Sequence, residues 1–316
     1  MMAVNLANLA THTLNGIQYG FILFLIASGL TIILGILDVL NLAHGELYAV
    51  GAYIAFSVFG YASGLVVNPE GVIGLAVFLV VALLAAVVAA AVLIPLGVLL
   101  ETLFLRPLYD RDEVYQLVLT FGLLLILKDV NKLVWGPQPV RASEIYSGIN
   151  AIPVAQYVGL NFPTFKLVII FVGAAVVLGL FYFFNRTKTG RIIRATAIDR
   201  EMATAIGVST DRTFTLVFAL GAFFAGFAGA MALPQSNANL AMGANPLVLS
   251  FVVIVIGGLG SLRGAFVGAM IVGVLSRWTV WQYPPAELAA PFALMALIPL
   301  GKPTGLSGTW GDAARR

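Results

Sequence analysis

LTIILGILDVLNLAHGELYAVGAYIAF, residues 30–56, is apolar enough to form a membrane helix, yet polar side chains interrupt it at Asp38, Asn41, His44 and Glu46. An ionisable group in hydrocarbon costs several kcal/mol unless it faces protein or water. A helix exposed to lipid would therefore carry no such residues. The segment predicts a membrane helix with a polar break that faces the interior of a helical bundle.

The composition of the whole chain is that of an integral membrane protein. Of its 316 residues, 60% are hydrophobic and only 10% are charged, whereas a soluble domain carries about 25% charged residues. The apolar runs are continuous rather than alternating, which predicts an all-α polytopic membrane bundle and argues against a β-barrel. The chain has no cysteine, which excludes disulfides, and its small excess of basic residues gives no reason to expect a nucleic-acid partner.

About eight membrane segments are expected in a single transmembrane domain that spans residues 1–316, since each crossing needs about 20 apolar residues. The predicted segments are 14–37, 46–60, 71–100, 114–135, 165–184, 213–233, 246–282 and 288–300. Two apolar regions, 14–60 and 246–282, are interrupted by polar residues and glycine. Either region could cross the membrane twice or re-enter it, and the sequence leaves both options open.

The distribution of Lys and Arg predicts which connections face the cytoplasm. The loops 101–113 and 185–212 and the C-terminal tail carry most of the basic residues, whereas the long connection 136–164 contains only Arg141. Connections rich in Lys and Arg are retained on the cytoplasmic side of a membrane. The two loops and the tail are therefore expected in the cytoplasm, and 136–164 and the N-terminus on the outer side.

The two interrupted regions share a plan, in which an apolar run is followed by a break with polar residues and glycine, and then by a helix of small residues. Paired, glycine-interrupted segments in the two halves of a chain point to the binding site of a transporter. This plan predicts a polar substrate pathway that the residues of the two breaks line or gate. They are Asn41, His44, Gly45, Glu46, Gly257, Gly258, Gly260 and Ser261.

A purely structural role is also open for the polar residues of the first break. Asn41 can cap the half-helix that follows, and Glu46 can interact favourably with the helix dipole in its first turn. His44 would then hydrogen-bond a neighbouring carbonyl group. Small residues after each break, such as Gly51 and Gly268, are expected to form helix-packing surfaces.

Residues 192–206 within the basic loop 185–212 predict a short amphipathic helix. One face is apolar, and the opposite face is polar and charged. The apolar residues are Ile198, Met202, Ala205 and Ile206. Gly207 supplies a stop signal for this helix. A helix of this kind can lie in the headgroup layer of the membrane or insert its apolar face into a groove of a partner protein, and composition leaves both open.

No motif for catalysis or metal binding is found in the sequence. The phosphate-binding pattern G-x-x-x-x-G-K-[ST] is absent, because GKPTG at 301–305 has Pro303 where Ser or Thr is required. The chain has two histidines, which are too few for a metal cluster without several carboxylates nearby. The chain is therefore expected to have no enzymatic activity and to hold no cofactor or metal.

Several ordered motifs resemble one known family. Glu201-x-Ala203-x-x-x-Gly207 resembles the E-A-A-x-x-x-G core of the cytoplasmic loop of bacterial ABC importer permeases, although Met202 stands where the second motif residue is usually Ala. The stretches NLAHGELYAVGAY, GRIIRATAIDREMATAIGVSTDR, VIGGLGSLRGAFVGA and KPTGLSG occur in the order expected of branched-chain amino acid permeases of the LivH type. The resemblance covers nearly the whole chain.

This resemblance implies a multi-subunit importer in the inner membrane of a bacterium. The implied partners are a LivM-like second permease, two ATP-binding subunits that hold ATP and Mg, a periplasmic solute-binding protein, a small-molecule substrate and membrane lipid. In that family the cytoplasmic loop docks on the ATPases. The residues implied in ATPase coupling are Ile198, Glu201, Met202, Ala203, Ala205, Ile206 and Gly207.

The resemblance implies import of branched-chain or other hydrophobic amino acids. Permeases for urea or short-chain amides look similar, so they remain the alternative within the same class. A self-sufficient channel or secondary transporter is the alternative from another class. That alternative would need no loop for docking a partner, so the basic loop 185–212 argues against it.

Overall fold

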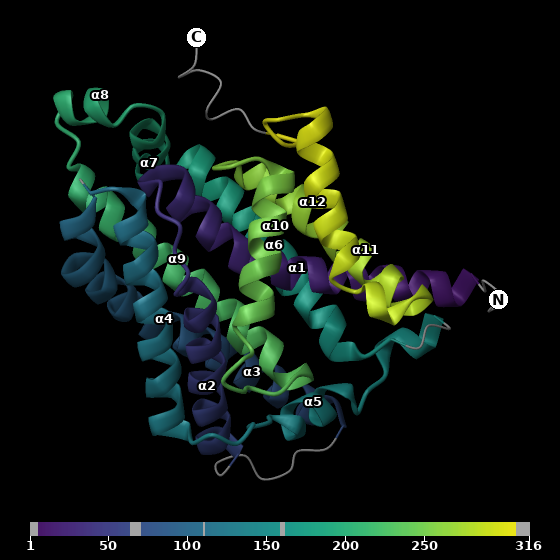
Figure 1. Cartoon of the computed structure of the whole chain (residues 1–316). Helices are drawn as coiled ribbons and strands as arrows, with labels where there is room; N and C mark the ends of the chain where they lie inside the picture. The colour runs from purple at the N-terminus through teal and green to yellow at the C-terminus, as the bar shows by residue number, and fades with distance from the viewer. Residues whose placement is uncertain (1–5, 64–70, 110, 159–161, 308–316) are drawn as a thin grey trace.

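A computed structural model describes residues 6–63, 71–109, 111–158 and 162–307, and the chain in these ranges folds into helices (Figure 1). Within them no β-sheet occurs, and extended pairing is limited to an isolated bridge between Val140 and Ala238. The predicted all-α polytopic membrane bundle is confirmed. The helices are α1 (Leu6–Leu37), α2 (His44–Ser63), α3 (Gly71–Leu100), α4 (Glu113–Trp135), α5 (Ser143–Asn150), α6 (Thr164–Arg186), α7 (Lys188–Ile198), α8 (Arg200–Ala205), α9 (Thr210–Ala232), α10 (Ala244–Gly257), α11 (Leu262–Gln282) and α12 (Ala289–Gly301).

Five of the described helices are long and apolar enough to cross a membrane: α1, α3, α6, α9 and α11. The shorter apolar helices α10 and α12 and the more polar helices α2 and α4 occupy the other predicted segments. Each interrupted region contains two helices. In the second region α10 and α11 run antiparallel, because Gly257 packs against Gly264 and Gly268 packs against Val253.

The central element of the bundle is α9, which contacts α1, α2 and α3 and is buried over most of its length. Glycines on α9 allow α1 and α2 to approach until the backbones touch. Gly221 lies against Gly29 of α1, and Gly226 lies against Gly51 of α2. A Cβ atom added at Gly51 would clash with the backbone of Gly226. Small residues at such crossings are the usual means of packing helices tightly in a membrane.

The bundle has two ends, which we call the α8 end and the α5 end after the short helices that lie there (Figure 1). The α8 end holds the start of α9 and the ends of α1, α3 and α10, whereas the α5 end holds the ends of α2, α9 and α11. Lys302 of the C-terminal tail lies in a cavity with Arg194 of α7. The predicted cytoplasmic segments 101–113 and 185–212 and the described part of the tail thus share the α8 end.

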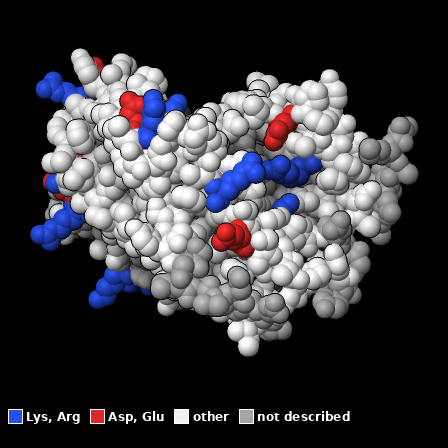
Figure 2. Space-filling model, turned by 90° about the horizontal axis from the view of Figure 1, so that it is seen from below, with Lys and Arg blue, Asp and Glu red and all other residues white. Residues whose placement is uncertain are grey.

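The face at the α5 end carries its own basic residues. Figure 2 shows this face from below, with Lys and Arg side chains in a band across its middle and Asp and Glu on both sides of the band. Helix α5 belongs to the connection 136–164, for which the sequence predicted no helix. It packs on the core through the buried side chains of Ile145 and Ile149.

Substituting one of the touching glycines should destabilise the bundle. In Gly51→Val the new side chain would meet the backbone of α9, and overpacking of this kind costs about 1–3 kcal/mol. We expect a melting temperature several degrees lower for the purified protein in detergent, measured by tryptophan fluorescence. Gly179→Val on α6 is the matched control, because a Cβ atom there meets nothing within 4 Å. Equal melting temperatures for the two variants would contradict the packing argument.

Candidate functional site

The polar residues of the first break are buried at the start of α2. A ring nitrogen of His44 lies 3.0 Å from the carbonyl oxygen of Ile26, and Asn41 Oδ1 accepts a hydrogen bond from the N–H of Ala43 at 3.1 Å. Glu46 lies in the first turn of α2. The His44 contact and the position of Glu46 are those of the structural role, whereas Asn41 bonds Ala43 just before α2 begins and does not cap its first turn. They leave Asn41 Nδ2, His44 Nδ1 and Glu46 Oε2 buried with no hydrogen-bond partner among the described residues.

The predicted pathway residues of the two breaks pack against different partners in the structure, although Asp38 of the first break lines a cavity with Leu259 and Gly260 of the second. Gly45 at the start of α2 packs against Gly243 and Leu247 at the start of α10. Gly257, Gly258, Gly260 and Ser261 instead form the turn between α10 and α11 at the α8 end, where Gly260 packs against Gly35 of α1. The first break therefore faces the connection before α10, a segment that the sequence analysis did not single out.

The turn 257–261 has its own local explanation. Gly258 and Gly260 adopt positive φ values of 104° and 72°, which favour glycine. Ser261 caps α11, since its Oγ accepts a hydrogen bond from the N–H of Gly264 at 3.1 Å. These residues shape the α8 end of the bundle, and Gly260 and Ser261 line a cavity there.

Helix α1 borders cavities at both ends of the bundle and is closed off between them. At the α5 end, α1 residues from His12 to Ile22 line a cavity of about 670 Å³. At the α8 end, two cavities of about 540 and 430 Å³ both include Ile36 and Gly260. Every α1 residue from 23 to 30 is buried, and His44 packs on Gly29 in this closed section. A path along α1 is thus open at each end and sealed in the middle.

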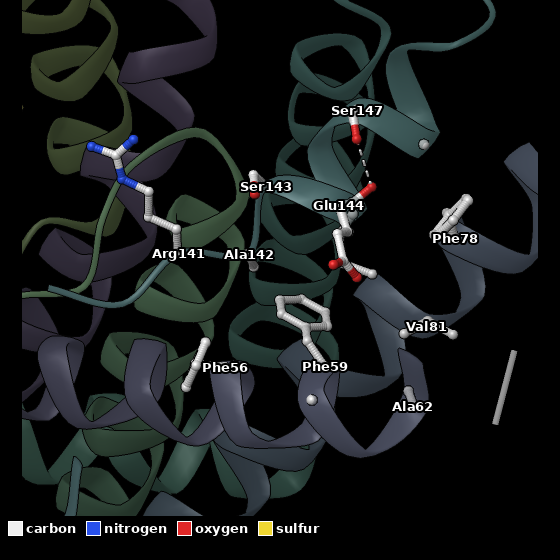
Figure 3. Close-up of a pocket in the computed structure, with 13 residues that line it drawn as sticks. Phe56, Phe59, Ala62, Phe78, Val81, Arg141, Ala142, Ser143, Glu144 and Ser147 are labelled. Carbon is white, nitrogen blue, oxygen red and sulfur yellow. Dashed lines mark hydrogen bonds between the residues drawn. The ribbon is translucent and has the colours of Figure 1, made fainter. Parts of the chain in front are cut away.

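A second pocket at the α5 end lies between α2, α3 and α5 and has a volume of about 390 Å³ (Figure 3). In Figure 3 the side chain of Glu144 points towards Phe59 across the pocket, and Arg141 points away from it. Phe78 packs against Gly148 and fixes α5 to α3. The exposed side chains of Arg141 and Glu144 make this surface a charged rim around an apolar floor.

The prediction of one helix over 192–206 is wrong, because the chain breaks at Asp199 between α7 and α8. Asp199 has an extended backbone with φ −152°, and its Oδ1 accepts a hydrogen bond from the N–H of Met202 at 2.8 Å. Aspartate caps a helix more readily than it continues one. The stop at Gly207 is as predicted: its φ is 89°, and Val208 N–H donates to Ala203 O as in a Schellman motif.

The apolar side chains predicted to meet a partner are exposed on this pair of helices. Ile198 is 60% exposed, Met202 59% and Ile206 71%. Ala203 is buried, whereas Glu201, Ala205 and Gly207 are exposed with the others. Large apolar side chains gathered at the tip of a charged loop are typical of a surface that another protein covers.

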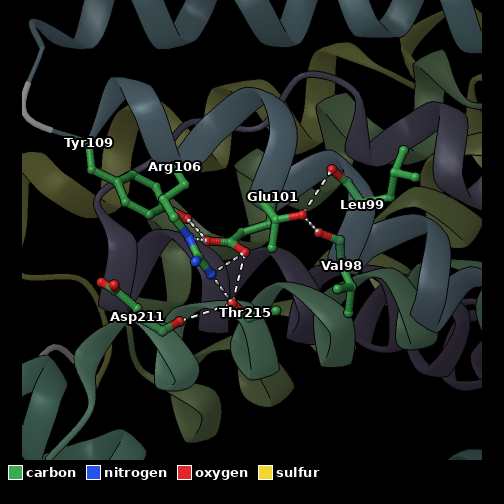
Figure 4. A network of polar contacts seen from close by, with 8 residues as sticks. Val98, Leu99, Glu101, Arg106, Tyr109, Asp211 and Thr215 are labelled. Atoms are coloured by element: carbon green, nitrogen blue, oxygen red, sulfur yellow. Dashed lines mark hydrogen bonds and ion pairs between the residues drawn. The ribbon is translucent and has the colours of Figure 1, made fainter.

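A polar network joins the end of α3 to the start of α9 (Figure 4). Arg106 donates from Nε and Nη2 to the two carboxylate oxygens of Glu101, at 3.2 Å each, and Nη2 also donates to Thr215 Oγ1 at 2.6 Å. Tyr109 donates its hydroxyl to Glu101 at 3.0 Å. Glu101 is fully buried, so these bonds offset the free-energy cost of removing its carboxylate from water.

A π-helical turn over Glu101–Leu105 brings the two charges together. The N–H of Arg106 bonds to the carbonyl of Glu101, five residues back, so the two side chains share a face that an α-helix would not give them. The network continues towards α8, because Phe214 of α9 stacks under the Arg200 guanidinium at 4.7 Å and meets the Tyr109 ring edge-on at 5.3 Å. Glu101 was not among the predicted site residues, although an acidic residue directly after the apolar run 71–100 is a visible signal of this link.

The chain belongs to the family described as branched-chain amino acid transport system permease component, whose model matches residues 12–299. This family is a transport component, so the chain is a transport subunit and not an enzyme. The resemblance to LivH-type permeases is confirmed. Within the described ranges no group of three or more His, Cys, Asp or Glu is placed to hold a metal ion.

Three relatives show how far the similarity extends. The high-affinity branched-chain amino acid transport system permease protein LivH of Escherichia coli K12 is 29% identical over 306 residues, covering 93% of this chain and 94% of the relative. BraD of Pseudomonas aeruginosa, named for the same function, is 28% identical over 299 residues with the same coverage. LivM of Salmonella typhimurium is 26% identical over 316 residues, covering 90% of this chain and 67% of LivM. No solved structure matches the chain.

Removing the charge of Glu101 should loosen the junction of α3 and α9. Glu101→Gln weakens a bidentate bond with Arg106, and a hydrogen bond to a charged group contributes about 1.5–3 kcal/mol. We expect a lower melting temperature in detergent and faster proteolysis near residue 109. Glu113→Gln removes the same charge from an exposed position nearby and should leave both measurements unchanged. A Glu101→Gln protein as stable as the wild type would show that the network does not hold the junction.

Proposed function

We propose that this chain is the permease subunit of a bacterial ABC importer that moves branched-chain or other hydrophobic amino acids into the cell by alternating access, driven by partner ATPases. The observation that carries this proposal is the family match across residues 12–299. The relatives LivH and BraD are named for branched-chain amino acid transport. These names favour amino acids over the urea or amide alternative.

The two-ended cavity arrangement supports alternating access. A transporter of this kind must close its pathway on one side before it opens on the other, and helix α1 has cavities at both ends with a sealed section between them. His44 and Gly29 lie in the sealed section. In this proposal they belong to the closed gate, and the unpartnered polar atoms of Asn41 and Glu46 become available to solute or water when it opens.

The α8 end is the place where we expect the ATPases to bind. The exposed side chains of Ile198, Met202 and Ile206 would enter a groove on an ATP-binding subunit, with ATP and Mg held by that subunit. Movement of α8 would then reach the bundle through Arg200 and Phe214, and through the Glu101 network to α3. This series of contacts would connect the ATP-binding subunits rigidly to the helices that border the gate.

The remaining partners follow from the same arrangement. With the α8 end in the cytoplasm, the α5 end faces outwards, and a periplasmic solute-binding protein would dock there beside the pocket with Arg141 and Glu144. A LivM-like chain would be the second permease, and the complex would lie in the bacterial inner membrane. The exposed apolar side chains of α3, α4 and α6 fit contact with lipid or with that second permease.

A negative charge among the exposed apolar side chains of Ile198, Met202 and Ile206 should prevent ATPase binding. Met202→Asp would bury an unpaired carboxylate in an apolar contact, so we expect affinity for the ATP-binding subunits to fall at least about a hundredfold. The measurement is co-purification of the ATPases with the tagged permease from membranes. Thr204→Asp on the same helix is the control, because it adds the same charge at an exposed polar position.

Full retention of the ATPases by Met202→Asp would contradict the assignment of the coupling surface. Uptake of labelled leucine by the complex reconstituted in vesicles tests the wider proposal. Uptake that needs no ATP and no ATPase would contradict an importer of this class.

A further inference from the structure

The cavity at the α5 end is lined by side chains from helices distant in sequence. Its residues come from α1, α2, α5, α6, α11, the last residue of α9 and the turn after it, and the cavity has a volume of about 670 Å³. Its lining residues include Asn15, Gln18, Tyr19, Tyr48, Lys166 and Arg277. A free amino acid fits easily into such a space, since small-molecule sites fill about 300–1,000 Å³.

The cavity reaches deep into the bundle, towards the sealed section of α1. From His12 to Ile22 the helix rises about 15 Å, at 1.5 Å per residue. Ile22 and Tyr48 at the deep end lie one helical turn from Ile26 and His44, which are in contact with each other. The cavity therefore ends directly above the closed gate, which suits a solute waiting to pass.

Two cations border this cavity, and neither forms an ion pair within 4 Å with a carboxylate of the described residues. Lys166 and Arg277 both line it, and neither Asp nor Glu is among its lining residues. Among the described residues, the one ion pair is that between Glu101 and Arg106. Buried or half-buried cations are normally paired, because leaving water is costly for a charge. Two unpaired cations at one cavity are a preformed site for an anionic group.

The contacts of the two cations leave most of their donors free. The Lys166 ammonium donates to Asn15 Oδ1, and the Arg277 guanidinium stacks on the Tyr19 ring at 4.1 Å and donates no hydrogen bond to a described residue. Gln18 adds a further donor, because its Nε2 is buried and has no hydrogen-bond partner in the described part of the chain. The contact with the Tyr19 ring holds the guanidinium at the cavity, and a guanidinium can bind a planar carboxylate through two parallel hydrogen bonds.

We propose that Lys166, Arg277 and Gln18 bind the carboxylate of the transported amino acid in this cavity, before the gate opens. This inference rests on the proposed function. Ile22 and Val280 offer apolar surface for a branched side chain, and the Tyr48 hydroxyl and the Ser236 hydroxyl can accept from the ammonium group. Neutral urea would leave both cations unpaired, so the site also separates the two substrate classes.

Photolabelling of the assembled complex, without the solute-binding protein, tests the site directly. The complex is reconstituted in phosphatidylcholine vesicles and irradiated with a diazirine analogue of leucine, and the labelled peptides are identified by mass spectrometry. We expect labels on cavity residues such as Tyr48 and Trp281. The carboxamide form of the same probe should label them about tenfold less, because it has no negative charge to pair with the two cations.

The variants Lys166→Gln and Arg277→Gln should lose the labelling by a similar factor while retaining the ATPases in co-purification. Lys302→Gln removes a cation from the cavity at the α8 end and should change neither result. The conservative variants Lys166→Arg and Arg277→Lys should keep part of the labelling, since each retains the charge.

The outcomes separate this inference from the proposed function. Equal labelling by acid and amide probes, or labelling unchanged in the glutamine variants, would overturn the carboxylate site even if the wild-type complex imports leucine. A tightly bound anionic lipid found by mass spectrometry, with no labelling by the leucine probe, would also overturn it. Labelling that follows the expected pattern in a complex that imports no branched-chain amino acid would keep the site and reject the proposed function.

Discussion

Contact between helix backbones at glycine is the constraint on which the structure depends. In a membrane the lipid tails are as apolar as leucine, so helices gain little from burying apolar side chains and associate mainly through close packing. Here α9 touches α1 at Gly221 and Gly29, and α2 at Gly226 and Gly51. Any larger side chain at these crossings would push apart helices that border the gate.

The same close packing explains why the centre of the bundle is closed. With Gly29 against Gly221, no space remains along α1 between the cavities at its two ends, and His44 fills the position beside them. A packed section of this kind moves as a unit rather than deforming gradually. Opening must therefore shift whole helices, and the stiff contacts from α8 through Arg200 and Glu101 to α9 and α3 suit that task.

Charge is placed where the bundle can tolerate it. Glu101 is buried only because Arg106, Tyr109 and Thr215 surround it. Lys166 and Arg277 lie at a polar cavity that opens at one end of the bundle, where solvent or a ligand can neutralise them. Asn41, His44 and Glu46 of the first break each keep a buried polar atom without a hydrogen-bond partner among the described residues. Burying such an atom costs free energy, and polar residues inside a membrane are typical of functional sites.

The sequence by itself determined the all-α membrane class, an interruption of the first apolar region around Asp38 and Asn41, the stop at Gly207 and the apolar residues of the 185–212 loop. These features depend on hydropathy, helix capping and charge among residues that are close in sequence, so the sequence is sufficient to predict them. Tertiary structure decided that Gly45 packs against Gly243 rather than against the 257–261 turn. It also decided that a π-helical turn brings Glu101 and Arg106 together, where both bond to Thr215. Finally, it placed Lys166 and Arg277 at the same cavity. The physical reason is that helix crossings are set by which glycines touch, and a single sequence shows where glycines occur but not which of them meet.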